Sequence, residues 1–179
     1  MPTPDDAATN ATAETFEATA RARVSELADD IDLGTFAAAF NLFRAASQLV
    51  QDLEPQVHRP LGLSIAGFRI LFTVWTLGEL QPRQLARLAG VSRAAISGAL
   101  KTLERDGLVE RHRDDLDGRL VNVRLTPLGA TTVETAYIEQ NRRERLLFES
   151  LDHDELEALA SMIRRVLASP VIANDNAAS

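Results

Sequence analysis

The apolar residues of this chain recur at helical spacing over most of its length. Between residues 33 and 57 they fall mostly three, four or seven positions apart, which predicts an amphipathic helix. Residues 59–63 include a proline and a glycine and are expected to end that helix. Ser64 has the side chain of a helix cap, and a second helix is expected to run to about residue 76, before Gly78 stops it.

Residues 80–125 hold the most informative pattern. Pro82 suits the start of a helix, and a second helix is expected after a tight turn. Ala86, Gly90 and Ile96 have the spacing of a helix-turn-helix. The motif needs a small residue where the two helices cross, a glycine in the turn and an aliphatic residue that faces the core.

A two-stranded hairpin is predicted directly after the second helix. Residues 108–111 follow the helix stop at Gly107, and residues 121–125 alternate apolar and polar side chains as a half-buried strand does. Together these elements predict a mainly α fold with a small β-hairpin wing. In this fold class a winged helix-turn-helix domain stands on a helical dimerisation frame.

Two further helices are expected after the hairpin. Thr126 and Pro127 have the chemistry of a helix start, and a last helix is expected between Asp152 and Pro170. Long amphipathic helices at both ends of the chain cannot bury all their apolar residues alone. We therefore infer a homodimer whose interface uses the first long helix and the last two. The predicted domains are an acidic, loose tail at 1–30 with a frayed helix at 13–27, a helical dimerisation region at 31–63 and 127–168, a winged-helix domain at 64–126, and a loose tail at 169–179.

The composition excludes several kinds of chemistry. The chain has no cysteine, which excludes disulfides, thiolate metal sites and cysteine nucleophiles. His58, His112 and His153 lack the spacing of metal ligands, so no metal or other cofactor is expected. An enzyme is not expected either, because the sequence has no glycine-rich phosphate loop, nucleophile elbow or paired acid–base cluster. No apolar run approaches the roughly 20 residues that span a bilayer, and the N-terminus lacks the pattern of an export signal. A cytoplasmic protein without a membrane partner is the expectation.

Charge is distributed unevenly along the chain. The whole chain has a formal net charge of −7, but residues 81–125 carry nine Arg or Lys and six Asp or Glu, a net charge of +3. Phosphate binding depends on the local density of basic residues and not on the total. The winged-helix segment is therefore the part of the chain that suits double-stranded DNA.

The second helix of the motif is expected to lay its N-terminal half in the major groove. Arg93 suits a guanine or a phosphate, and Ala94 suits a thymine methyl group. At the tip of the hairpin, Arg119 is placed to enter the minor groove, and Asp117 is placed to brace its guanidinium. A solvated face on the helix and an ordinary surface turn at the tip are the structural alternatives. The predicted DNA-binding residues are Ser92, Arg93, Ala94, Ser97, Lys101, Arg113 and Arg119.

Several short runs between residues 41 and 129 occur in the order of a known family. They lie at 42–46, 60–64, 84–87, 90–94, 103–109, 117–119 and 125–129. Through these runs the chain resembles the MarR family of bacterial winged-helix transcriptional regulators. The resemblance implies a homodimer that binds a palindromic operator, usually to repress. It also implies that the second helix of the motif reads the major groove and that the wing arginine enters the minor groove, roles that fall here on Ser92, Arg93, Ser97 and Arg119. Gly98 departs from the pattern, since many members have a bulkier or basic residue there.

Many members of that family bind small, often aromatic acids in a crevice between the dimerisation frame and the winged helix. The candidate lining residues for such an effector are His58, Arg59, Phe68, Phe72 and Trp75. An aromatic run at helical spacing is also typical of a core, and a surface histidine would suit a position next to Pro60. The alternative function is a winged helix used for protein contact, an adaptor that binds no effector.

Overall fold

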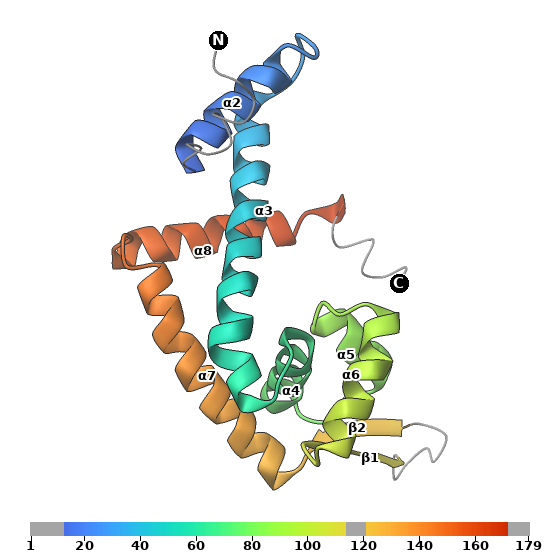
Figure 1. Cartoon of the computed structure of the whole chain (residues 1–179). Helices are drawn as coiled ribbons and strands as arrows, with labels where there is room; N and C mark the ends of the chain where they lie inside the picture. The colour runs from blue at the N-terminus through green and yellow to red at the C-terminus, as the bar shows by residue number, and fades with distance from the viewer. Residues whose placement is uncertain (1–12, 114–120, 172–179) are drawn as a thin grey trace, which may run out of the picture. The chain divides into compact units, whose positions relative to one another are not determined.

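The computed structural model of the chain describes residues 13–113 and 121–171 (Figure 1). Contacts within the chain separate it into two units, Met1–Gln51 and Asp52–Ser179. Helix α3 (Leu33–Leu53) begins in the first unit and ends in the second.

The first unit contains helix α2 (Ala13–Ser25) and most of α3. Before α3, the carboxylate of Asp32 accepts hydrogen bonds from the Thr35 N–H at 3.0 Å and the Thr35 hydroxyl at 3.1 Å, which lowers the pKa of Asp32. The ring of Phe16 on α2 meets that of Phe40 edge-on at 5.4 Å, and the Arg44 guanidinium lies 5.4 Å from both ring centres. The sequence predicts a loose tail with a frayed helix at 13–27. The structure has a helix at Ala13–Ser25, which contacts α3 through Phe16 and Phe40.

The chain changes helix type where α3 ends. Residues Glu54–His58 form a π-helix, η1, and Arg59–Leu61 form a 3-10 turn, η2. Gly62 follows with a φ of 74°, a left-handed conformation that glycine adopts without strain. Ser64 then caps α4 (Ile65–Leu77), because its hydroxyl accepts a hydrogen bond from the Gly67 N–H at 3.0 Å. The predicted helix break and the predicted cap are both confirmed.

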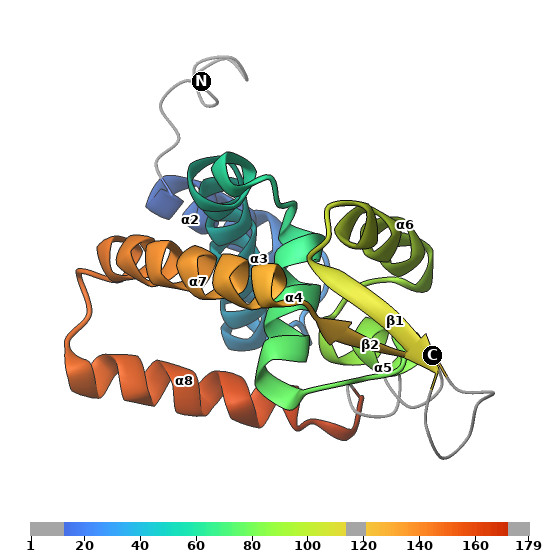
Figure 2. The ribbon, with the colours of Figure 1, turned by 90° about the horizontal axis from the view of Figure 1, so that it is seen from below.

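Residues 64–126, here called the reading head, form a helix-turn-helix followed by a hairpin (Figure 2). After α4 its elements are α5 (Pro82–Leu88), α6 (Arg93–Arg105), β1 (Val109–Arg113) and β2 (Val121–Leu125). The strands are antiparallel, with Val109 opposite Leu125, and α6 packs beside β1 while α5 packs beside β2. Gly90 has a φ of 62° in the turn between α5 and α6, as the motif requires.

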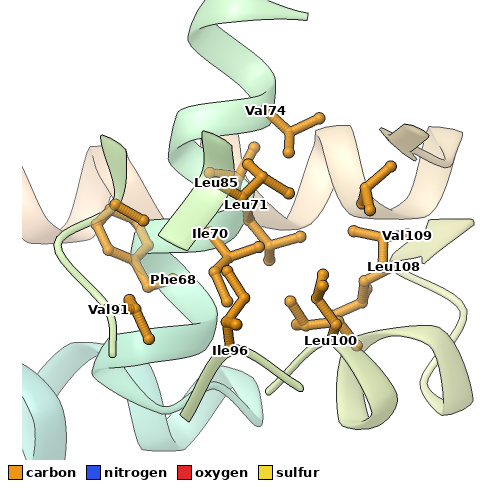
Figure 3. Packing of buried hydrophobic residues seen from close by; sticks show 14 of the residues in the cluster. Phe68, Ile70, Leu71, Val74, Leu85, Val91, Ile96, Leu100, Leu108 and Val109 are labelled. Carbon is orange, nitrogen blue, oxygen red and sulfur yellow. The ribbon is translucent and has the colours of Figure 1, made fainter. Parts of the chain in front are cut away.

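A hydrophobic core joins the helices of the reading head to its hairpin (Figure 3). Ala86 and Ile96, the positions predicted to meet where α5 crosses α6, are both buried. Val133 and Ala136 on the first half of α7 are buried in the same core, so α7 is anchored to the reading head. The core residues labelled in Figure 3 are Phe68, Ile70, Leu71, Val74, Leu85, Val91, Ile96, Leu100, Leu108 and Val109.

Helices α7 (Pro127–Leu147) and α8 (His153–Leu167) follow the hairpin. Thr126 caps α7 by accepting a hydrogen bond from the Gly129 N–H at 3.0 Å, and Asp152 caps α8 by accepting one from the Glu155 N–H at 2.9 Å. No residue of α8 is buried. Among the described helices, none is by itself both long and apolar enough to cross a membrane. The fold class predicted from the sequence, mainly α with a β-hairpin wing, is confirmed.

Candidate nucleic-acid interface

The turn between α5 and α6 sets the start of the predicted recognition helix. Ser92 has extended backbone angles, and its hydroxyl oxygen accepts a hydrogen bond from the Ala95 N–H at 3.2 Å. The cap therefore uses an acceptor site of Ser92 and leaves its hydroxyl hydrogen free to donate. Ser92 is exposed, so the N-terminus of α6 is open to solvent, and the positive end of the helix dipole there favours a phosphate.

The outer face of α6 consists of two small residues followed by a lysine. Ala94, Gly98 and Lys101 lie on the side opposite the buried Ile96 and Leu100, and all three are exposed. A Cβ built on Gly98 would meet no heavy atom within 4 Å. Because the residues at 94 and 98 are small, the backbone of the first half of α6 can approach a DNA surface closely.

Other predicted DNA-binding residues are placed by these elements. Ser97 is exposed on α6, and Arg93 is the first residue of that helix. Arg113 ends β1, where its backbone lies opposite Val121. Asp117 and Arg119 lie outside the described residues. The DNA contacts of this set stay predictions.

The described cations of the wing strands are paired with carboxylates. Arg111 lies 3.0 Å from Glu104 of α6, measured from Nε to Oε1. Arg124 Nε donates to Glu110 Oε1 at 2.8 Å across the two strands. Arg105, at the end of α6, is held by the neighbouring Asp106; the pair raises the pKa of the guanidinium and lowers that of the carboxyl.

Four exposed cations of the described reading head make no ion pair with any described carboxylate. They are Arg69 of α4, Arg83 and Arg87 of α5, and Lys101 of α6. Arg83 and Arg87 are four residues apart, so they share one face of α5. Arg83 and Arg87 are not among the DNA-binding residues predicted from the sequence, although their spacing of four on the first helix of the motif is visible there.

The candidate effector residues are only partly brought together. His58 is fully buried, stacks on Phe68 at 4.5 Å and lies 2.9 Å from Gln140 Oε1 through Nε2, so it is not a surface histidine. Burial lowers its pKa. Phe68 is a core residue, while Phe72 lies between Phe68, Trp75 and Tyr137 at ring distances of 5.2–5.8 Å. These aromatic side chains pack on one another and on the core.

A cleft of about 580 Å³ lies between α6 and the segment that runs from η1 to the start of α4. Of the five candidate effector residues its lining includes Arg59 alone. Its walls are largely apolar, and the recognition helix supplies Ala95, Gly98 and Thr102. The volume falls within the usual range for small-molecule sites.

This arrangement is that of a winged helix-turn-helix protein, and comparison with known proteins gives the family. The MarR family model matches residues 63–121. The uncharacterized HTH-type transcriptional regulator YwaE of Bacillus subtilis is 33% identical over 138 residues, which cover 77% of this chain and 81% of that protein. The HTH-type transcriptional repressor YetL of the same organism is 26% identical over 136 residues, covering 75% and 81%. The chain belongs to the MarR family of transcriptional regulators, which are not enzymes.

Solved structures of the family show the same fold. A MarR-family regulator from Silicibacter pomeroyi aligns with a TM-score of 0.65 and 27% identity over 73% of this chain and 88% of that one. A mutant of MarR from Escherichia coli in complex with operator DNA aligns with a TM-score of 0.64 and 25% identity, covering 72% and 92%. NadR in complex with 4-hydroxyphenylacetate aligns with a TM-score of 0.63 and 25% identity, covering 72% and 91%.

Proposed function

We propose that this regulator is a homodimeric repressor that binds a palindromic operator through α6 and the wing. The observation that carries the proposal is the face of α6, with small exposed residues before Lys101, inside the one segment of net charge +3. The operator complex of MarR supports DNA as the partner, and the repressor name of YetL supports the direction of control.

Exposed apolar side chains on the last two helices support a dimer. Leu146 on α7 and Leu156, Met162 and Val166 on α8 are between 37% and 58% exposed. Because no residue of α8 is buried, contacts within its own chain stabilise this helix little. A second copy of the chain is the partner that would bury its apolar face. Two reading heads related by twofold symmetry would contact half-sites about 10 base pairs apart.

The test is selection of bound sequences from a random DNA pool, followed by binding measurements on the selected site. We expect a site with inverted symmetry. Arg119→Ala should weaken binding by roughly 1–3 kcal/mol, and Arg93→Ala should relax base preference at one position of each half-site. Arg164→Ala on α8 removes the same charge outside the reading head and serves as the control. A selected site without symmetry would contradict the dimer, and unchanged binding by Arg119→Ala would contradict the wing contact.

We further propose that a small aromatic acid bound in the cleft releases the operator. Arg59 lines the cleft and is exposed, and its described ion pair, from Nε to Glu54 Oε1, is long at 3.8 Å. Its guanidinium therefore keeps N–H groups that can donate to the carboxylate of a ligand, while the apolar walls contact its ring. Because Ala95 and Gly98 of the recognition helix line the same cleft, an occupant would touch the element that is proposed to read DNA. The 4-hydroxyphenylacetate of NadR supports this class of ligand.

Titration of a panel of aromatic carboxylates, by calorimetry and by competition with operator DNA, tests the effector site. Arg59→Ala should lower affinity for an active ligand while leaving operator binding intact. Ligand binding that is equally tight in the Arg59→Ala variant would move the site elsewhere.

A further inference from the structure

Glu79 lies in the short connection between α4 and α5, at a point where the backbone is fixed on both sides. Gly78 ends α4 with a φ of 80°. Leu80 pairs with Val123 of β2: Leu80 N–H donates to the Val123 carbonyl at 3.2 Å, and Val123 N–H donates to the Leu80 carbonyl at 2.9 Å. The connection therefore adds a one-residue third strand to the hairpin and brings Glu79 beside the middle of the two strands.

The Glu79 carboxylate is linked to both strands of the wing. Its Oε2 lies 2.8 Å from Nε2 of His112 on β1, and its Oε1 lies 3.8 Å from Nη1 of Arg124 on β2. Arg124 also donates to Glu110 on β1. One carboxylate thus joins the α4–α5 connection to the two strands whose far ends lead into the wing tip.

The partners are held in place themselves. The Nδ1 atom of His112 is buried, and within the described part of the chain it has no hydrogen-bond partner, so Nε2 is the ring atom that makes the polar contact. His112 lies opposite Asn122, and Glu110 lies opposite Arg124, in the register of the hairpin. The contacts of Glu79 with both strands therefore depend on how the hairpin is placed against the α4–α5 connection.

An acid at this position acts against phosphate binding if charge alone is considered. Each carboxylate near the DNA-facing surface weakens the attraction of the reading head for the phosphate backbone. The geometry indicates that Glu79 instead orients the side chains that it contacts. Hydrogen bonds to a charged group are stronger than those between neutral groups, and they fix the direction of the side chains that they join.

We propose that Glu79 is a positioning residue that fixes the direction of the wing on the reading head, so that operator affinity depends on it through the wing tip. The proposal rests on the proposed function, in which the wing contacts DNA. It assigns Glu79 no contact with DNA of its own.

The first experiment compares Glu79→Ala with Asp106→Ala, using the full chain and the selected operator. Each change removes one carboxylate from the reading head, but Asp106 pairs only with its neighbour Arg105 in the described contacts. We expect Asp106→Ala to bind as tightly as the wild type or more tightly. Glu79→Ala should bind roughly five- to tenfold more weakly, toward the lower end of the loss expected for one wing contact.

Glu79→Gln keeps an oxygen that can accept from His112 and should bind with an affinity between those of Glu79→Ala and the wild type. This variant also serves as the test if Glu79→Ala fails to fold, which thermal denaturation would reveal. Tighter binding by both Glu79 variants, matching that of Asp106→Ala, would overturn the proposal, since charge would then be the whole effect.

The second experiment combines Glu79→Ala with Arg119→Ala in a double-mutant cycle. If Glu79 acts through the wing tip, the double variant should bind no more weakly than Arg119→Ala alone. If the losses of binding free energy in the two single variants add in full, Glu79 does not act through the wing tip, and the proposal is overturned. Failure of the proposed function is distinguishable, because the wild type itself would then select no operator.

Discussion

Replacing Gly129 by alanine should strongly destabilise the protein, because the backbone of the reading head passes directly over this position. A Cβ built on Gly129 would overlap the carbonyl oxygen of Leu108 and lie 2.8 Å from its carbonyl carbon. The turn between α6 and β1 is tied to the start of α7 by two hydrogen bonds: Thr126 N–H donates to the Leu108 carbonyl at 3.1 Å, and the Thr126 hydroxyl donates to the Gly107 carbonyl at 2.6 Å. The methyl group can therefore be accommodated only if these segments separate.

The expected loss in the free energy of unfolding is the sum of an overpacking cost and the cost of two lost hydrogen bonds. Overpacking a tight contact costs about 1–3 kcal/mol, and losing two hydrogen bonds adds about 1–3 kcal/mol. The sum of about 2–6 kcal/mol is a large part of the roughly 5–15 kcal/mol that stabilises a typical domain. For a chain of this size the melting temperature should fall by at least about 5 °C.

Gly98→Ala is the matched control, since it makes the same change in a helix with nothing within 4 Å of the new Cβ. It should stabilise the protein by about 0.5–1 kcal/mol, because alanine loses less backbone entropy than glycine on forming a helix. Urea unfolding of both variants, followed by circular dichroism at equal protomer concentration, measures the two effects. A Gly129→Ala variant within about 1 kcal/mol of the wild type would refute the reasoning, since backbone contacts of that closeness leave no cheaper adjustment.

Three further outcomes are expected. Because burial lowers the pKa of His58, the free energy of unfolding should fall as the pH drops below about 6.5, where the unfolded chain binds a proton that the folded chain does not. Urea unfolding at several pH values should show this dependence in the wild type and not in His58→Phe. Equal pH dependence in the two proteins would contradict the prediction. Arg143→Ala should lower the free energy of unfolding, because Arg143 donates to both oxygens of Asp52 at 2.6 and 2.7 Å and so lowers the pKa of that carboxyl. This stabilisation should be lost in acid as Asp52 is protonated, and Arg142→Ala, whose partner is on its own helix, should have the smaller effect. Gly98→Arg should raise operator affinity and steepen its dependence on salt by about one phosphate contact per protomer, and an unchanged salt slope would show that position 98 does not face the DNA.

Local chemistry was readable from the sequence because a helix cap depends on neighbours within four residues. Ser64, Ser92, Thr126 and Asp152 each accept a backbone hydrogen bond from the residue three positions later. The helix-turn-helix followed in the same way, since its glycine turn and its buried aliphatic position are set by spacing along the chain. The order and the bounds of the helices could therefore be predicted closely.

The candidate effector residues could not be sorted by the same means. Periodicity places Phe68, Phe72 and Trp75 on one stripe of α4 but does not tell which neighbour covers each of them. In the structure Phe68 is covered by His58, whereas Trp75 remains 44% exposed and donates to Glu134 of α7 at 3.2 Å. These partners come from η1 and α7, which lie outside α4, and the periodicity of α4 does not show which of them covers each ring.

The sequence alone also does not show which charged residues of the reading head are available to bind DNA phosphates. A count along the sequence treats every Arg and Lys of residues 81–125 as equal. The fold instead pairs Arg111 of β1 with Glu104 of α6, and the register of β1 against β2 pairs Arg124 with Glu110. An ion pair leaves a guanidinium less free to neutralise a phosphate, because the carboxylate partner must first be displaced or must share it. Among the described cations, phosphate attraction should therefore come mainly from α5 and α6, while those of the strands hold the wing in its direction.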